Sequence, residues 1–214
     1  MDLNLNIYVQ NVGTENEVSI LPYINFDENP EYYALVKNLD IFNVKCTKCG
    51  HEEMFQFDTL IVDPTHKYFL YLFCDEEKIN SFRKNIDYFV NTVLNASEIK
   101  DWDLIKTRLV LDFNSLVEKM AIFEIGLNDK AIEFIKAGLK ERNIVKSKNA
   151  EILFDGLNQT NLEFISIDEN ENLDKVNVSI NFYNKIIENI NNLKDDKINF
   201  ELIDQNWVKS KIED

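Results

Sequence analysis

The stretch LVEKMAIFEIGLNDKAIEFIK, residues Leu116–Lys136, decides how the middle of this chain folds. Apolar residues recur at helical spacing on both sides of a short polar break, which predicts two helices joined by a tight turn. Gly126 stands where glycine commonly ends a helix. Asn128 stands where an amide side chain caps the helix that follows. The apolar positions of the two predicted helices are Leu116, Met120, Ile122, Phe123, Ile132, Phe134, Ile135 and Leu139.

Alternating and apolar runs before this hairpin predict β-structure. Leu3–Gln10 and Val18–Phe26 form one predicted hairpin, and Phe42–Cys46 with Met54–Val62 forms a second. The run Lys67–Cys74 is apolar on both faces, which is typical of a central strand. This region is completed by a short helix from Asn29 to Val36, a helix over Glu76–Leu94 and a strand over Leu104–Phe113.

We predict both strands and a helix in the segment that follows the helical hairpin. Its apolar runs predict three strands, one helix and a last strand. These elements cover Glu151–Phe154, Leu162–Ile167, Val176–Ile180, Asn181–Leu193 and Ile198–Ile203. The chain as a whole is therefore expected to be an α+β protein.

The charge balance narrows the classes of function. Lysine and arginine number 23 and acidic residues 38, so the net charge is −15. Nucleic-acid binders neutralise phosphates with clustered basic residues, and anionic membranes repel an acidic chain. The charge instead favours solubility, or docking onto a basic surface. No basic n-region precedes an apolar run in residues 1–20, and the odd count of three cysteines is typical of a reducing compartment, so we expect a cytoplasmic protein.

The motif Cys46-Thr47-Lys48-Cys49-Gly50 is the one recognisable chemical pattern. Two thiolates separated by two residues can hold one side of a zinc ion, but a structural site usually needs four ligands. The other candidates are Cys74, His51 and His66, which lie elsewhere along the chain. The sequence therefore predicts no cofactor, with zinc on Cys46 and Cys49 as the open alternative.

Catalytic and calcium motifs are weak or absent. No phosphate-binding glycine loop or nucleophile elbow occurs, and two histidines leave few options for acid–base catalysis. Asp101-Trp102-Asp103 is a lone pair of carboxylates. Asp168–Asn172 begins like a calcium loop, but the required glycine is replaced by Leu173. The sequence therefore predicts a protein that is not an enzyme.

Two segments carry a resemblance to a known family. They are VKCTKCGHEE (44–53), followed by TLIVDPTHKYFLYLF (59–73), and the helical hairpin Leu116–Lys136. The chain resembles the CpXC-domain family, bacterial proteins with two zinc-ribbon knuckles and a following α/β region. The family's first knuckle corresponds here to Val9–Gly13, where valines stand at both ligand positions.

The resemblance implies a particular α+β fold. It implies a degenerate zinc-ribbon-like antiparallel β-sheet with packed helices, plus a C-terminal α/β segment. We expect a ribbon-like β-rich region over residues 1–112. A helical hairpin and α/β region follows over 113–214, and the two can form one compact domain.

The predicted function is that of a non-enzymatic acidic protein which binds and inhibits a partner. The partner is expected to be a basic, nucleic-acid-processing enzyme such as an RNA-guided CRISPR nuclease. The likeness to phage anti-CRISPR proteins is in charge and size only. The alternative is an intracellular CpXC-type structural or regulatory module. The acidic face expected to bind comprises Asp27, Glu28, Glu31, Glu52, Glu53, Asp75, Glu76, Glu77, Asp168, Glu169 and Glu171.

Overall fold

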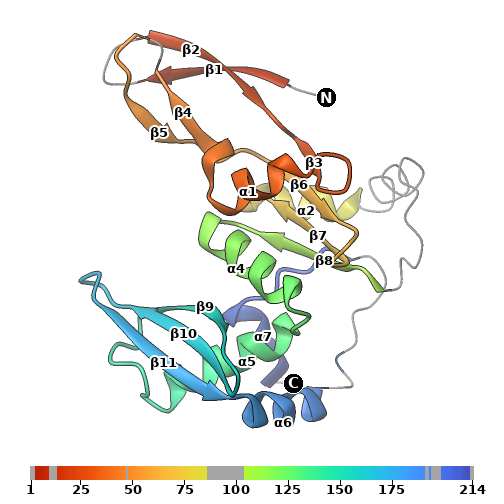
Figure 1. Cartoon of the computed structure of the whole chain (residues 1–214), viewed down its shortest axis with the longest axis vertical. Coiled ribbons are helices and arrows are strands. Elements are labelled where there is room, and N and C mark those ends of the chain that lie inside the picture. Colours follow the sequence, from red (N-terminus) through yellow and green to blue (C-terminus); the bar gives the residue numbers. More distant parts are fainter. Residues whose placement is uncertain are drawn as a thin grey trace. The chain divides into compact units, whose positions relative to one another are not determined.

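The computed structural model (Figure 1) describes residues 3–9, 14–46, 48–85, 104–190, 193 and 199–212, with side chains from Ile20 onward. The chain forms two compact units. Unit 1 comprises Met1–Leu116 and Ile198–Phe200, and unit 2 comprises Val117–Lys197 and Glu201–Asp214. The α+β class is confirmed. In the described part of the chain, no helix has the length and apolar character needed to cross a bilayer.

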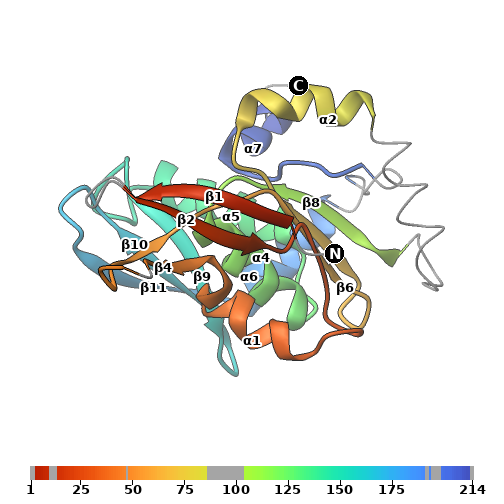
Figure 2. The same cartoon turned by 90° about the horizontal axis from the view of Figure 1, so that it is seen from above.

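Two antiparallel hairpins belong to unit 1. Strands β1 (Leu3–Val9) and β2 (Thr14–Ile20) form the first, and β4 (Asn43–Lys45) and β5 (Glu52–Met54) form the second. Both lead away from the main sheet of the unit (Figures 1 and 2). Each was predicted, but with strands that are too long. Val18–Phe26 and Met54–Val62 each contain the end of a hairpin strand and a separate strand of the main sheet.

The main sheet of unit 1 has the order β3-β6-β7-β8. Its strands are β3 (Tyr23–Asn25), β6 (Thr59–Asp63), β7 (Tyr68–Leu72) and β8 (Lys106–Val110). Every residue of β6 is buried, and β7 lies in the centre, as the apolar run predicts. The sheet is mixed and not antiparallel, because β3 pairs parallel to β6 and β7 parallel to β8. Both parallel pairs are joined by long connections, which parallel pairing requires.

Short helices pack around this sheet. They are α1 (Glu31–Lys37), which follows Pro30 as predicted, η1 (Asp40–Phe42), η2 (Glu76–Lys78) and α2 (Ile79–Lys84). Aromatic rings fill the space between elements: Phe42 lies 5.0 Å from Phe57 and 4.7 Å from Phe113 between ring centroids. The predicted helix Glu76–Leu94 is seen as η2 and α2 up to Lys84, and residues 86–94 lie outside the described residues.

The predicted helical hairpin is confirmed as α4 (Phe113–Glu124) and α5 (Asp129–Glu141). Gly126 has a φ of 72°, in the left-handed region that glycine favours. Its N–H bonds the carbonyl of Phe123 and the N–H of Leu127 bonds that of Ile122, which is the Schellman arrangement. The Asn128 side chain accepts hydrogen bonds from the first turn of α5, as expected for a helix cap.

Unit 2 adds a meander of three antiparallel strands and two helices. The strands β9 (Glu151–Leu157), β10 (Asn161–Ile167) and β11 (Leu173–Ser179) lie in that order, with α6 (Ile180–Ile190) directly after β11 (Figure 1). Alternate residues of β10 are buried, so one face covers the core. The predicted strand Ile198–Ile203 is wrong. Its described residues hold only a single bridge at Glu201, and α7 (Gln205–Ile212) follows.

Candidate functional site

The structure distributes the predicted acidic residues over both units. Asp27, Glu28, Glu31, Glu52, Glu53, Asp75, Glu76 and Glu77 belong to unit 1, and Asp168, Glu169 and Glu171 belong to unit 2. A single acidic face composed of all of them stays a prediction. The structure does show which of these carboxylates form hydrogen bonds or ion pairs with neighbouring residues.

Three of these carboxylates, Glu52, Asp75 and Glu169, lie outside the β3–α1 connection and each has a hydrogen-bond or ion-pair partner. Glu52 Oε1 lies 2.7 Å from Lys45 Nζ across the β4–β5 pair. Asp75 caps η2 by accepting the N–H of Glu77. Glu169 accepts a hydrogen bond from the Ser147 hydroxyl at 2.8 Å.

Asp168 organises the β10–β11 turn. One of its oxygens accepts the N–H groups of Asn170 and Asn172, at 2.8 and 2.9 Å. Side-chain and backbone hydrogen bonds from Asn172 lower the pKa of the Asp168 carboxyl. The turn that resembles the start of a calcium loop is thus held by its own hydrogen bonds.

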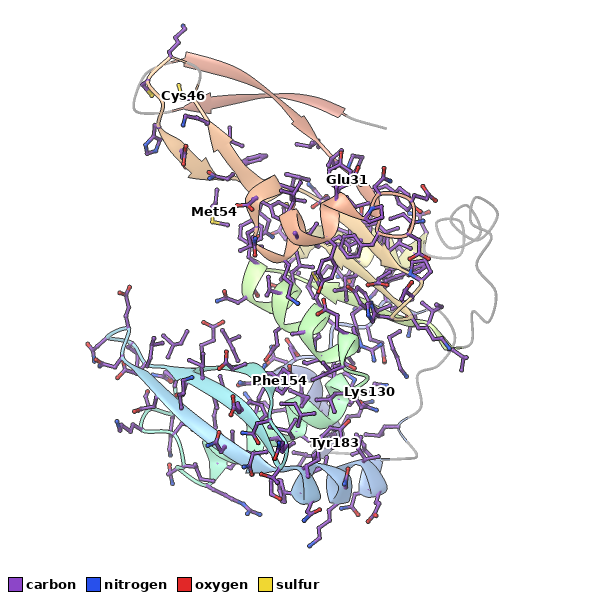
Figure 3. The ribbon with its side chains drawn as sticks, in the orientation of Figure 1. Glu31, Cys46, Met54, Lys130, Phe154 and Tyr183 are labelled. Atoms are coloured by element: carbon purple, nitrogen blue, oxygen red, sulfur yellow. The ribbon has the colours of Figure 1, made fainter. Side chains whose placement is uncertain are left out.

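The acidic residues around the β3–α1 connection are held by hydrogen bonds: Thr65 Oγ1 donates to Asp27 Oδ1 at 3.0 Å, and Asn25 Nδ2 donates to Glu28. We define the acidic patch as Tyr23, Asp27, Glu28, Glu31 and Leu35 (Figure 3 labels Glu31). Within the described residues, none of its three carboxylates forms an ion pair. No lysine or arginine occurs between residues 21 and 36.

Hydrogen bonds hold the acidic patch in shape. Asn25 is buried, and its Nδ2 donates to Glu28 Oε1 at 2.8 Å and to the Tyr23 hydroxyl at 3.3 Å. Asn25 Oδ1 accepts the Asp27 N–H at 3.0 Å. Burial first, and then the Glu28 charge, raise the pKa of the Tyr23 phenol, which therefore stays protonated.

The patch combines charge with exposed apolar surface. Tyr23 is 38% exposed and Leu35 is 37% exposed. Leu35 lies four residues after Glu31 on α1, so both side chains share one face of this helix. Protein interfaces commonly pair an exposed aromatic anchor with a polar rim. The patch has the chemistry of a surface for a basic protein.

The predicted metal pair lies at the turn of the β4–β5 hairpin (Figure 3 labels Cys46). Cys46 is buried and Cys49 is exposed, and both are free thiols. The Cys46 N–H bonds the His51 carbonyl and the Gly50 N–H bonds the Cys46 carbonyl, so backbone bonds close the turn. Among the described residues, no group of three or more histidine, cysteine or acidic side chains is placed to hold a metal.

The described donors do not fit a structural zinc, because two thiols fall short of the usual four ligands. Residues 10–13 of the expected first knuckle lie outside the described residues, as does Asp101-Trp102-Asp103. The absence of a cofactor stays a prediction, with zinc on Cys46 and Cys49 as its alternative.

Cys74 has a distinct environment at the end of β7. Its N–H donates to Asp58 Oδ1 at 2.8 Å. Burial, and then hydrogen bonding and charge from Asp58, raise the pKa of the Cys74 thiol to about 12. At neutral pH this thiol is therefore protonated and a poor nucleophile or metal ligand.

A buried ionic cluster joins α4, α5 and β9, and the sequence did not reveal it. We define it as Glu118, Lys119, Asp129, Glu133 and Lys136, all of which are nearly fully buried. Lys136 Nζ lies 2.9 Å from Glu118 Oε2 and 3.0 Å from Glu133 Oε1. Lys119 Nζ lies 3.2 Å from Asp129 Oδ2 and 3.4 Å from Glu133 Oε1.

The cluster also holds the edge of the sheet. Glu118 Oε1 accepts the backbone N–H of Phe154 on β9 at 2.6 Å (Figure 3 labels Phe154). Burial, and then the charge of Glu133, raise the pKa of the Glu118 carboxyl. Burial lowers the pKa of Lys136, but Glu118 and Glu133 outweigh it and the net direction is upward. Such perturbed groups occur at functional sites and in structural networks alike. Here the carboxylates contact buried lysines and the backbone of β9, which is a structural network.

One signal in the sequence could have located this cluster. Asp129, Glu133 and Lys136 recur at i, i+4 and i+7, so they share one helical face. This spacing alone does not distinguish a buried charged face from a solvated one, because a helix in isolation does not show which of its faces other elements will cover.

Comparison with known proteins adds one finding. A family model described as CpXC protein matches residues 10–136, which is 127 of the 214 residues. No curated protein and no solved structure matches the chain. The matched range contains both segments on which the resemblance rested, the Cys46–Cys49 hairpin and the Leu116–Lys136 helical hairpin. The chain therefore belongs to the CpXC protein family.

Proposed function

We propose that this chain is a non-enzymatic binding protein which docks a basic surface of a partner protein on the acidic patch. The observation that carries the proposal is a set of three exposed carboxylates, Asp27, Glu28 and Glu31, which form no ion pair within the described residues and lie beside the exposed Tyr23 and Leu35. Unpaired charge raises the association rate with an oppositely charged partner and selects against others. The exposed apolar side chains supply contact area that charge alone does not.

The partner proposed is a nucleic-acid-processing enzyme, because such an enzyme neutralises phosphates with clustered lysine and arginine and therefore has a strongly basic groove. Occupation of that groove would inhibit the enzyme. The comparisons give no support to the narrower expectation of an anti-CRISPR protein. We therefore describe the partner by its basic surface and name no class of nuclease.

The ribbon interpretation belongs to the same proposal. The β1–β2 and β4–β5 hairpins would be the two ribbons of a degenerate zinc-ribbon-like module. The second ribbon has kept Cys46 and Cys49. The first carries Val9 at one expected ligand position. In this interpretation, valine stands where the family has a metal ligand on one side of the module.

A pull-down with matched baits tests the proposal. The intact chain, a Glu28→Lys/Glu31→Lys variant and a Glu76→Lys/Glu77→Lys control are immobilised and incubated with bacterial extract at low and high salt. The two variants carry the same net charge, and all four positions are exposed in unit 1. We expect a basic nucleic-acid-processing protein on the intact chain and on the control at low salt only. The patch variant should lose it.

Two results would contradict the proposal. Equal loss of the captured protein on both variants would mean that overall charge, and not the acidic patch, is responsible. Capture that does not change with salt would exclude an electrostatic interface. An eluate without any basic protein would favour the alternative, a CpXC-type structural or regulatory module.

A further inference from the structure

Unit 2 has an open groove between β11 and three helices. Its free volume is about 460 Å³, within the range of ligand and peptide pockets. Side chains from α5, β11, α6 and α7 line it, and apolar surface predominates. Around it Ile144 is 53%, Phe182 39% and Ile212 59% exposed. Single exposed apolar residues are ordinary, but three around one hollow form a patch typical of interaction sites.

The floor of the groove contains an unexplained glycine. Gly138 lies inside the last turn of α5, and glycine is among the least favourable residues in a helix. A Cβ at this position would meet no atom within 4 Å. Neither backbone conformation nor packing inside the unit therefore requires a glycine here. Its effect is to leave the floor of the groove open.

The groove runs along an unpaired strand edge. β11 is the outer strand of its sheet and pairs only with β10 among the described strands. Side chains alternate along a strand, whereas four consecutive residues, 176–179, line the groove. A groove that follows consecutive residues lies beside the backbone of the strand.

The register shows which backbone groups face that edge. At one end of the β10–β11 pair, the N–H of Asp168 donates to the carbonyl of Asn172. At the other end, the N–H of Ile180 donates to the carbonyl of Thr160. Hydrogen-bonded pairs alternate along an antiparallel ladder, so even-numbered residues of β11 face β10. The N–H and C=O groups of Lys175 and Asn177 therefore point away from the sheet. In the described part of the chain, they form no other hydrogen bond.

The border of the groove is basic, although the whole chain carries −15. Its lining contains one cation and one carboxylate, Arg142 and Glu141. The lining residues have several charged neighbours in sequence. Those that reach solvent in the described part of the chain are all lysines, Lys140, Lys175, Lys185 and Lys211. Of these, Lys175 Nζ lies 3.7 Å from Asp155 Oδ2 and Lys140 Nζ donates to Gln205.

We propose that this groove binds an extended segment of another protein, which adds to β11 as a fourth strand. Backbone hydrogen bonds to Lys175 and Asn177 would supply affinity, as in other cases of strand addition. Alternate apolar side chains of the segment would enter the groove over Gly138. Acidic residues flanking them would face the bordering lysines. This surface lies in unit 2 and the acidic patch in unit 1, so either proposal can fail without the other.

A designed peptide tests the proposal. The probe is a labelled Asp-Val-Thr-Ile-Asp-Val peptide, with two controls: a scrambled peptide of the same composition and one with lysines in place of its aspartates. Binding to the full chain is measured by fluorescence polarisation. We expect a dissociation constant below about 1 mM for the probe, and binding about tenfold weaker for each control. The amides of Lys175 and Asn177 should exchange with solvent more slowly when the probe is bound.

Two variants at one position separate the groove from the fold. Gly138→Leu places a side chain in the open floor and should weaken binding by at least about tenfold. Gly138→Ala adds only the Cβ, for which there is space, and should change binding by less than about twofold. The melting temperature of each variant shows that it is folded.

Several outcomes would overturn the proposal. They are the absence of probe binding at about 1 mM, equal binding of the scrambled peptide, or unchanged affinity in a folded Gly138→Leu variant. Preferential binding of an amphipathic helical peptide would exclude strand addition. A dimer that Gly138→Leu dissociates would show that the groove receives a second copy of this chain instead.

Discussion

Asp168 and Glu31 carry the same charge but have different roles. Asp168 accepts hydrogen bonds from its own turn, whereas Glu31 forms no ion pair or hydrogen bond within the described residues. A carboxylate that already holds a turn has less to offer a partner, and its loss damages the fold. Local bonding therefore distinguishes structural acids from those that are free to bind.

The same reasoning applies to the cysteines and gives a prediction on reactivity. Cys49 and Cys74 are both exposed, but partial burial and the neighbouring Asp58 raise the pKa of the Cys74 thiol to about 12. Alkylation requires the thiolate, so we expect iodoacetamide at pH 8 to modify Cys49 at least about tenfold faster than Cys74. Peptide mass spectrometry over time measures both rates in one sample.

Asp58 provides the control for that prediction. Its charge and hydrogen bond both raise the pKa of the Cys74 thiol, so Asp58→Asn should lower that pKa and speed modification of Cys74. The rate at Cys49 should not change. Equal rates at the two cysteines of the unaltered chain would show that the environment of Cys74 is not as described.

At the scale of elements, the ionic cluster sets the stability of the helical hairpin. Lys136 is the cation between two buried carboxylates, Glu118 and Glu133. Lys136→Met should therefore reduce the free energy of unfolding by about 3–5 kcal/mol, because it leaves buried charge uncompensated. Adding Glu118→Gln should restore part of the loss. Chemical denaturation measures the free energy of unfolding of the unaltered chain, of Lys136→Met and of the double variant. An unchanged value for Lys136→Met would contradict a structural role for the cluster.

The cluster also predicts how stability depends on pH. The folded-state pKa of Lys136 is raised above its unfolded value of 10.5. Its contribution is thus fully present below pH 10.5 and is lost as the pH rises through the folded-state pKa. Melting temperatures at increasing alkaline pH should fall more steeply for the unaltered chain than for Lys136→Met/Glu118→Gln. Parallel curves would exclude Lys136 as the responsible group.

Gly138 gives a prediction in the opposite direction. Gly138→Ala should raise the free energy of unfolding by about 0.5–1 kcal/mol, since alanine is favoured inside helices and the site has space for its Cβ. Urea denaturation measures the difference. A loss of stability would mean that α5 needs this glycine for its own packing.

Elements with local signals could be predicted from the sequence, and those defined by distant contacts could not. The Gly126 turn and Asn128 cap follow from rules that act within a few residues. Met54–Val62 looks like one apolar run, but it divides because β5 pairs with β4 and β6 pairs with β3 and β7. Helix α7 has few apolar positions, and its place depends on Lys130, which contacts both Glu201 and the Trp207 ring.

The candidate site follows the same division. The net charge predicted an acidic binding surface, and Asp27, Glu28 and Glu31 were among the residues expected to form it. Which acids form an ion pair and which only accept hydrogen bonds depends on contacts such as Lys45–Glu52 and Asn25–Glu28. The groove beside β11 could not be predicted, because it depends on where a strand edge and three helices meet.

At the scale of the whole molecule, both units are acidic but to different degrees. Unit 1 contains 10 basic and 19 acidic residues, and unit 2 contains 13 and 19. The larger excess lies in unit 1, which also contains the acidic patch. We therefore propose that the basic partner binds unit 1 and that a segment with acidic and apolar residues binds unit 2.

The measurement that tests this account most directly is the affinity for the captured basic partner as a function of salt. It compares the intact chain with Glu31→Lys and with the matched control Glu76→Lys. We predict that Glu31→Lys weakens binding at least about fivefold at low salt and that the difference shrinks as salt screens the charges. The control should bind like the intact chain. Equal affinities of Glu31→Lys and the intact chain at low salt would contradict the central claim that the acidic patch is the binding surface.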